Sequence, residues 1–216
     1  MRFGASSPNF PPFDITSGIN DYGGISADYL ALIARNLNIN VSVRYYPSYQ
    51  MMLDALKEGE IDLIANAGGT EKHRYHLLLS QPYVASVPVL IKREDPQEPA
   101  PPGKEKIVID TLFAGNPAIV RQYPDAHFVS DNFPRRTLES ISFRQLDAYI
   151  GDRITVQYLI NQANLSNLQI HPLPDIQTEG FAFATTQKNQ PLTDIINKIL
   201  NQIPEPVRID ILRRWS

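Results

Sequence analysis

The chain has 216 residues, of which 43% are hydrophobic, enough to bury a sizeable core in one large domain or two small lobes. Its 20 Lys and Arg residues are balanced by 23 Asp and Glu residues without a basic block, so neither nucleic acid nor an anionic membrane surface is an obvious partner. No apolar stretch approaches the roughly 18 residues of a membrane span, and the absence of cysteine excludes disulfides and thiolate metal sites.

The first third of the chain alternates between strand-like and helix-like patterns. Apolar residues recur at helical spacing over 27–38 and alternate over 41–45, after a first strand at 2–5. Ser48 is placed to cap a second helix, and the apolar run 61–65 is typical of a buried parallel strand. This order predicts an α/β fold, in which function is expected at the carboxyl ends of the strands.

The alternation begins again after an apolar stretch at 84–91 and a proline-rich segment at 95–103, whose prolines exclude regular structure. The predicted elements are a strand at 107–109, a helix from Pro117 capped by Asn116, a strand at 128–129, a helix through 138–145, a short strand at 148–150 and a helix at 154–162. These elements form a second α/β unit.

The last part of the chain is predicted to return to the first unit. A strand at 180–185 precedes two helices with apolar faces, which have nowhere to pack in the second unit. We expect lobe 1 to comprise 1–88 and 181–216, lobe 2 to comprise 89–180 with the linker 95–103, and strands near 87–91 and 180–185 to cross as a hinge. Two lobes that are joined twice make a cleft.

Short motifs follow one another in a specific order. They are Pro11-Pro-Phe-Asp14, Gly24-Ile-Ser-Ala-Asp28-Tyr, Leu56-Lys-Glu-Gly-Glu-Ile-Asp62-Leu, Ser80-Gln-Pro-Tyr83, Leu146-Asp-Ala-Tyr-Ile-Gly-Asp152, Pro191-Leu-Thr-Asp-Ile-Ile-Asn and Ile211-Leu-Arg-Arg-Trp215. This order resembles the type II periplasmic solute-binding proteins, and within them the Venus-flytrap sensor domains of BvgS-type and EvgS-type sensor histidine kinases. The resemblance implies a two-lobed, type II periplasmic-binding-protein-like α/β fold (a Venus flytrap) that closes around a small polar ligand.

An amino-acid ligand requires a guanidinium group for its carboxylate and an acid for its ammonium group. The resemblance implies Arg74, twelve residues after Asp62, for the first role and Asp152 for the second. Each residue also has a plainer interpretation. Arg74 could be a solvated arginine in a charged stretch, and Asp152 could be the N-cap of the helix that starts near Ile154.

Aromatic side chains are expected to wall the ligand site. Phe13, Tyr22 and Tyr49 stand where the relatives place cleft aromatics, although such rings are as often part of the core. Asp28 and Asp62 match the motifs of the family, and we interpret them as structural residues that hold turns and strand ends.

Two loops supply further candidates. The backbone of Gly68 and Gly69 can approach a ligand closely after the strand at 61–65, and Thr70 adds a hydroxyl group. Gly115 and Asn116 open a helix whose free N–H groups could bind a carboxylate, but an ordinary helix start explains them equally well.

The common motifs of hydrolases, kinases, dehydrogenases and metalloproteases are absent from the sequence. His73 and His76 could share a helix face, but no third ligand completes a metal site, so neither a metal nor a cofactor is expected. A dehydratase-like enzyme of the same fold is left open. It would require an acid or base, for which Asp175 and Glu179 are the candidates.

We therefore predict a non-enzymatic, periplasmic ligand-sensing domain of a bacterial two-component sensor histidine kinase, with an amino acid or other small carboxylate as its partner. We expect a piece of a longer protein, which contacts the membrane only through segments outside this chain, and a homodimer is left open for the full-length receptor. A free-standing amino-acid binding protein of an ABC importer is the first alternative. The second alternative is an interaction domain with a permanently closed cleft.

Overall fold

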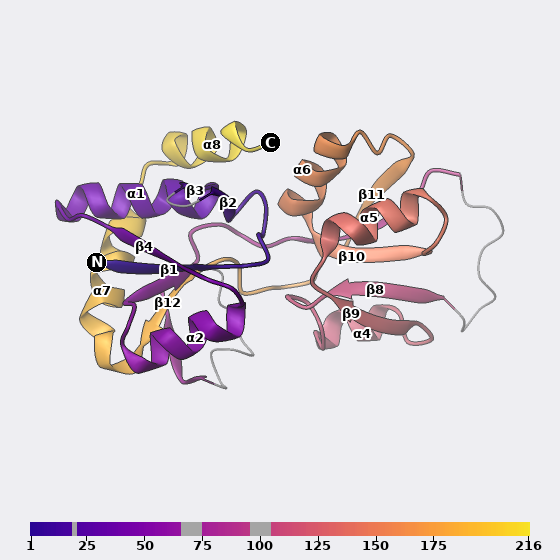
Figure 1. The fold of residues 1–216 in the computed structure, drawn as a ribbon. Helices are drawn as coiled ribbons and strands as arrows, with labels where there is room; N and C mark the ends of the chain where they lie inside the picture. Colours follow the sequence, from indigo (N-terminus) through magenta and orange to yellow (C-terminus); the bar gives the residue numbers. More distant parts are fainter. Residues whose placement is uncertain (19–20, 66–74, 96–104) are drawn as a thin grey trace. The chain divides into compact units, whose positions relative to one another are not determined.

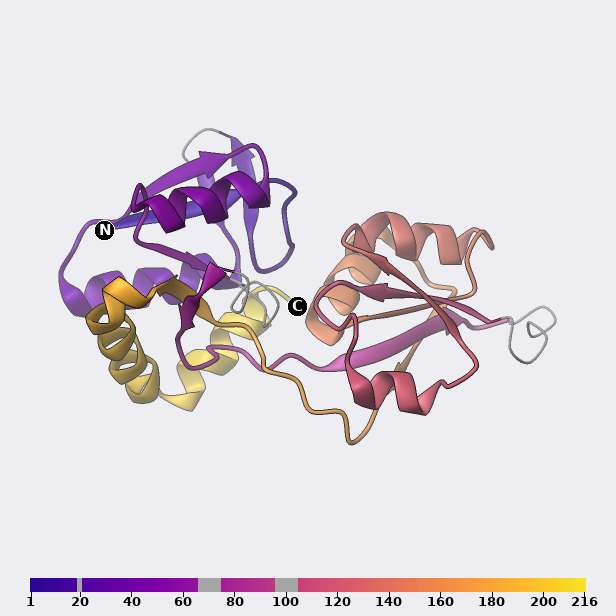
Figure 2. The same cartoon turned by 90° about the horizontal axis from the view of Figure 1, so that it is seen from below.

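The computed structural model describes residues 1–18, 21–65, 75–95 and 105–216. Unit 1 contains Met1–Ala85 and Glu179–Ser216, and unit 2 contains Ser86–Thr178 (Figure 1; Figure 2). The chain thus passes between the units twice, whereas the sequence places these two changes of lobe after residues 88 and 180. Each unit is an α/β structure, so the predicted fold class is confirmed.

Unit 1 is built on a sheet with the strand order β4-β1-β5-β12-β6. Its elements are β1 (Arg2–Ser6), β2 (Ile15–Gly18), β3 (Asp21–Gly23), α1 (Ile25–Leu37), β4 (Ser42–Tyr46), α2 (Tyr49–Glu58), β5 (Leu63–Ala65), β6 (Leu77–Leu79), β12 (Phe183–Thr186), α7 (Gln190–Gln202) and α8 (Glu205–Arg214). β1 pairs in parallel with β4 and β5, and β12 runs antiparallel to β5 and β6. The two C-terminal helices belong to unit 1.

Alternate residues of the unit 1 strands face opposite helical layers, with α2 on one side of the sheet and α1 on the other (Figure 1). A Cβ atom added at Gly4 would lie 2.4 Å from the Ile61 side chain and 3.0 Å from that of Met52, so glycine lets α2 pack closely on β1. On the other side, Phe3 and Phe183 are fully buried with their ring centroids 6.5 Å apart. The sheet is therefore covered on both faces.

Unit 2 is built on a second sheet with the strand order β11-β7-β10-β8-β9. Its elements are β7 (Pro88–Arg93), β8 (Lys106–Asp110), α4 (Pro117–Gln122), β9 (His127–Asp131), α5 (Pro134–Ser142), β10 (Ala148–Asp152), α6 (Arg153–Ala163) and β11 (Leu168–Pro172). β8, β9 and β10 are parallel neighbours, and β7 runs antiparallel to β10 and β11.

The period of two in the unit 2 strands divides the core into two clusters. Val108 and Tyr149 lie in the cluster that packs against α5 and α6. Their neighbours Ile109 and Ile150 lie in the other cluster, together with Ile119 of α4. These runs are apolar without interruption because both faces of the sheet are buried.

The structure moves the predicted hinge by a few residues. β7 begins at Pro88 and pairs inside unit 2, and β12 begins at Phe183 and pairs inside unit 1. The two links between the units are therefore Ala85–Ser86 and Thr178–Glu179, outside these strands. An apolar run indicates that a strand is buried, but it does not indicate which sheet buries it.

None of the helices in the described ranges is long and apolar enough to cross a membrane.

Candidate functional site

Phe13 lies in unit 1, in the loop that follows the carboxyl end of β1. Its ring is fully buried and packs on Phe181 with a centroid distance of 3.8 Å and on Phe10 at 5.8 Å. Gly24, the residue before α1, has a φ of +109°, and a Cβ atom there would lie 2.2 Å from the Phe13 carbonyl oxygen. Phe13 therefore occupies a core position, and glycine at residue 24 lets the chain pass close to the Phe13 backbone.

The Phe13 side chain allows the core and ligand-wall interpretations to be separated. We expect Phe13→Leu to lower the free energy of unfolding by about 1 kcal/mol, because the stacked ring is replaced by a smaller apolar side chain. Phe183→Leu is the matched control, since Phe183 is equally buried and is not a candidate ligand residue. If Phe13 is a core residue, thermal denaturation detects both losses and ligand affinity stays unchanged in both variants. A selective loss of affinity in Phe13→Leu would contradict this expectation.

Tyr22 lies on β3, the second strand of a small hairpin that precedes α1. Its hydroxyl group donates a hydrogen bond to the Asp14 carboxylate, and its ring lies 5.3 Å from that of Phe3. Burial and the nearby Asp14 charge raise the pKa of Tyr22 well above its usual value. At neutral pH, Tyr22 therefore remains a neutral donor that Asp14 holds in place.

The remaining unit 1 candidates follow the carboxyl ends of β4 and β5. Tyr49 is the first residue of α2, whose cap is confirmed: Ser48 Oγ accepts a hydrogen bond from Met51 N at 3.2 Å. Tyr49 is half-buried and packs against the core cluster beneath α2. The predictions for Gly68, Gly69, Thr70 and Arg74 fall outside the described residues.

In unit 2, three adjacent parallel strands end in aspartate at the carboxyl edge of the sheet. They are Asp110 of β8, Asp131 of β9 and Asp152 of β10. Each carboxylate accepts a hydrogen bond from the N–H group two residues further along, at 2.9, 3.2 and 3.0 Å respectively. The same local contact therefore ends each strand and leaves acidic groups along this edge.

Asp152 is the most constrained of the three aspartates. It is 1% exposed, and its carboxylate accepts hydrogen bonds from the N–H groups of Ile154 at 3.0 Å, Thr155 at 3.2 Å and Val87 at 3.0 Å. It is therefore the N-cap of α6, which was the alternative prediction. Burial raises the pKa of Asp152 to about 6, although the three N–H groups act in the opposite direction.

Asp110 is a second buried carboxylate beside Asp152. Tyr149 donates a hydrogen bond to it at 3.0 Å, and both side chains are almost fully buried. Burial raises the pKa of Asp110, and the Asp152 pKa is raised further by the Asp110 charge. Asp110 and Asp131 were not predicted from the sequence, although an apolar strand pattern that ends in aspartate recurs at all three positions.

Asn116 has the role of a helix cap. Its Oδ1 atom accepts hydrogen bonds from Ala118 N at 3.0 Å and Ile119 N at 3.4 Å, and its Nδ2 atom donates to the Gln177 carbonyl oxygen at 3.5 Å. Gly115 precedes it with a left-handed backbone, and Pro117 occupies the first turn. Two N–H groups of α4 that could have bound a ligand carboxylate are therefore bound by Asn116.

We expect Asn116→Ala to lower the free energy of unfolding by about 1 kcal/mol, because α4 loses its cap. Asn116→Ser is the matched control, since serine also caps helices and should restore most of the loss. Urea denaturation measures both variants. An affinity change in the alanine variant that exceeds its small stability change would instead assign Asn116 to ligand binding.

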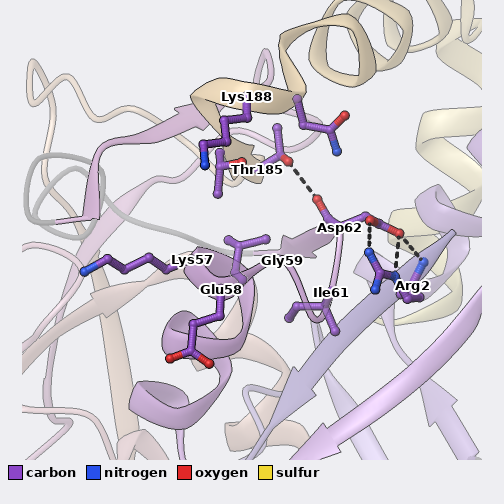
Figure 3. A pocket seen from close by; sticks show the side chains of 11 residues that line it. Arg2, Lys57, Glu58, Gly59, Ile61, Asp62, Thr185 and Lys188 are labelled. Atoms are coloured by element: carbon purple, nitrogen blue, oxygen red, sulfur yellow. Dashed lines mark hydrogen bonds and ion pairs between the residues drawn. The ribbon is translucent and has the colours of Figure 1, made fainter.

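In unit 1, a hollow of about 210 Å³ opens at the end of the sheet where β1 and β5 begin (Figure 3). The residues that line it are Arg2, Leu56, Lys57, Glu58, Gly59, Ile61, Asp62, Thr185, Thr186, Lys188 and Asn189. None of the predicted ligand residues is among them. The hollow lies at the amino-terminal end of β1, whereas the candidates in unit 1 follow the carboxyl ends of the strands.

Asp62 links the strands that line this hollow. Its carboxylate accepts hydrogen bonds from Arg2 Nη2 and from the Arg2 backbone N–H, each at 2.7 Å, and its carbonyl oxygen accepts from Thr185 Oγ1 at 2.7 Å (Figure 3). The hydrogen bond from the Arg2 side chain holds the pKa of Asp62 below its usual value. Asp62 thus joins β1, β5 and β12, the structural role predicted for it.

In the part of the chain that the structure describes, no group of three or more His, Asp or Glu side chains could hold a metal ion.

The chain from residue 4 to residue 216 matches the model of a family described as bacterial extracellular solute-binding proteins, family 3. It is 31% identical over 220 residues to virulence sensor protein BvgS of Bordetella pertussis strain Tohama I, which covers 100% of this chain and 18% of that protein. Sensor protein EvgS of Escherichia coli O157:H7 is 26% identical over 204 residues, covering 89% of this chain and 16% of EvgS.

Two further comparisons extend these matches. An arginine-binding periplasmic protein of Mannheimia haemolytica is 22% identical over 206 residues, which cover 92% of this chain and 83% of that protein. The crystal structure of the B. pertussis BvgS periplasmic domain matches with a TM-score of 0.84 and 31% identity, over 100% of this chain and 42% of that one. The chain spans less than a fifth of the length of BvgS and EvgS.

Proposed function

The chain belongs to family 3 of the bacterial extracellular solute-binding proteins, and we propose that it senses a small polar metabolite, with an amino acid as the first choice. The observation that carries this proposal is the family match over residues 4–216. The chain is a homologue of the Venus-flytrap domains of the sensor proteins BvgS and EvgS, as the order of its motifs predicted. The family also confirms the predicted extracytoplasmic location.

The acidic side chains at the carboxyl edge of the unit 2 sheet support a ligand with a cationic group. In unit 2, Asp152 and Asp110 lie at the carboxyl edge, where open α/β sheets bind their ligands. With a pKa of about 6, Asp152 is ionised above that pH and can attract an ammonium or guanidinium group. The proposal assigns the ligand carboxylate to Arg74, whose planar guanidinium group can grip it with two hydrogen bonds.

The proposal includes no catalytic step. The homologues compared above are sensor or solute-binding proteins. Of the acid–base candidates of the enzyme alternative, Glu179 is part of the second link between the units, and Asp175 lies three residues before Thr178. The chain would bind its ligand without changing it, and the output would be a change of conformation. A ligand with a higher affinity for one conformation shifts the population toward that conformation, and this shift transmits the signal.

A free-standing transport protein is the second candidate. The similarity to the arginine-binding protein of M. haemolytica favours it, because that alignment covers 83% of the relative. The higher identity to BvgS and EvgS favours the sensor.

Calorimetric titration with L-arginine, L-glutamine and L-glutamate tests the proposed ligand class, because the three amino acids share a backbone and differ in side-chain charge. We expect saturable binding of at least one of them, with arginine favoured by the acidic edge of unit 2. If N-acetylated or amidated forms bind as well as the free amino acid, the assigned carboxylate and ammonium contacts are wrong.

A further inference from the structure

Helix α8 contacts the rest of unit 1 through both apolar and polar side chains. Ile211 is the buried residue of this helix. Two charged residues make its polar contacts. Arg208 lies within α8, and Asp28 in the first turn of α1 binds the end of α8. These polar contacts fix the position of α8 in addition to the packing of Ile211.

Arg208 connects α8 to two backbone carbonyl groups. Its Nη1 atom donates a hydrogen bond to the Tyr83 carbonyl oxygen at 3.1 Å, and its Nη2 atom donates to the Leu200 carbonyl oxygen. The guanidinium carbon lies 5.8 Å from the centroid of the Tyr29 ring. The planar fork of arginine suits this arrangement, because it presents several donors in fixed directions.

Tyr83 belongs to the place where unit 1 holds both links between the units. Its N–H group donates to the Phe181 carbonyl oxygen, and the Phe181 N–H group donates to the Val84 carbonyl oxygen, each at 2.8 Å. Tyr83 lies just before the link Ala85–Ser86, and Phe181 lies just after the link Thr178–Glu179. Arg208 therefore contacts the backbone that pairs the two links.

Unit 2 holds the same links on its own side. Thr178 Oγ1 donates a hydrogen bond to the Ser86 carbonyl oxygen at 2.5 Å, and Val87 N–H donates to Asp152 at 3.0 Å. Both links are thus short segments between two sets of hydrogen bonds. A change of conformation in the links must be absorbed by these few residues.

The far end of α8 carries a spectroscopic reporter. Asp28 Oδ2 accepts hydrogen bonds from Arg214 Nη1 at 2.9 Å and from Trp215 Nε1 at 2.8 Å. Trp215 is the only tryptophan in the sequence. Its fluorescence therefore reports whether the end of α8 is seated on α1.

We propose that Arg208 is a positioning residue that couples the seating of α8 to the conformation of the two links. A change in the links alters the Tyr83 carbonyl group, Arg208 transfers this change to α8, and the contact between Asp28 and Trp215 responds. This coupling goes beyond ligand binding, because it names the element of unit 1 that responds to the links. Coupling between two sites is reciprocal, so each can be perturbed while the other is observed.

The first experiment perturbs α8 and observes the links. In Arg208→Met, we expect amide exchange of Tyr83 and Phe181, followed by NMR, to become about 10-fold faster, because local opening is easier without the Arg208 contact. Arg208→Lys should show a smaller increase, since lysine keeps the charge but lacks the fork. Arg213→Met is the matched control, because Arg213 is an exposed residue of the same helix.

The reciprocal experiment perturbs the links and observes α8. Thr178→Val removes the hydroxyl group that binds Ser86 and nearly preserves the shape of the side chain. We expect acrylamide to quench Trp215 about 2-fold more efficiently in this variant, because a part of the population has released the Asp28 contact. Ser142→Ala is the control, since it removes another hydroxyl hydrogen bond within unit 2, to Asn167.

Two results would overturn the coupling. One is unchanged exchange at Tyr83 and Phe181 in Arg208→Met while Trp215 becomes exposed, which would make Arg208 a local anchor of α8. The other is unchanged Trp215 quenching in Thr178→Val. If Arg208→Met does not fold, Arg208→Lys and Thr178→Val provide the same two tests. All measurements are made without ligand, so their failure is distinct from a failure to bind an amino acid.

Discussion

Asp152→Ala is expected to lower the free energy of unfolding by about 2–4 kcal/mol at pH 7, because α6 loses its cap and three backbone N–H groups lose their acceptor. These groups belong to Ile154, Thr155 and Val87, in the interior of unit 2 or at its edge. Urea denaturation followed by circular dichroism measures the loss. A change below about 0.5 kcal/mol, typical of a surface substitution, would contradict the role that the structure gives to Asp152.

Asp152→Asn separates charge from shape and adds a pH dependence. Because the folded-state pKa of about 6 is above the usual value of 3.8, the folded protein binds this proton more tightly than the unfolded chain does. The contribution of Asp152 to stability is therefore greatest at low pH and falls as the pH rises from about 4 to about 6. The asparagine variant lacks this contribution.

The stability difference between the wild type and Asp152→Asn is thus expected to be larger at pH 4.5 than at pH 7.5, by about 2 kcal/mol. Measuring the difference between two chains removes the effect of other carboxylates. Asp62, whose pKa is lowered, changes stability in the opposite direction in both chains. If the stability difference between the two chains is constant with pH, the pKa of Asp152 is not raised in the folded protein.

Arg74→Ala is expected to weaken the binding of a carboxylate ligand by about 100-fold or more, because a guanidinium partner of a bound carboxylate is lost. The thermal midpoint without ligand should change little. Calorimetric titration with the free amino acid measures the affinity. Arg135→Ala is the control, since Arg135 is an exposed residue of unit 2 that pairs with Glu139 on the surface. Unchanged affinity in Arg74→Ala would remove Arg74 from the site.

The sequence predicts the fold well where local signals agree with one another. Ser48 and Asn116 cap the expected helices, Gly59 ends α2 in a left-handed conformation, and the apolar runs become strands with both faces covered. The sequence does not predict the elements whose apolar pattern is short. β11 contains only two inward apolar residues, Leu168 and Ile170, and the small hairpin before α1 is held by irregular pairing.

The candidate site is less predictable because a residue type does not determine its surroundings. Phe13 and Asp152 were assigned by position in a motif, but the stacking of Phe13 on Phe181 depends on a residue far along the chain. The contacts of Arg208 with Tyr83 and of Asp28 with Trp215 likewise join distant segments. No periodic pattern encodes such contacts, so only the folded structure reveals them.

The most direct test of the central claim is a thermal-shift screen of ligand-stripped protein against the twenty amino acids, small dicarboxylates and aromatic carboxylates. At a hundred times its dissociation constant, a ligand stabilises the folded protein by about 2.7 kcal/mol, which raises the midpoint by about 5–10 °C for a chain of this size. We predict such a shift with one chemical class, led by amino acids. An unchanged midpoint with every compound would contradict the account of this chain as a domain that senses small polar metabolites.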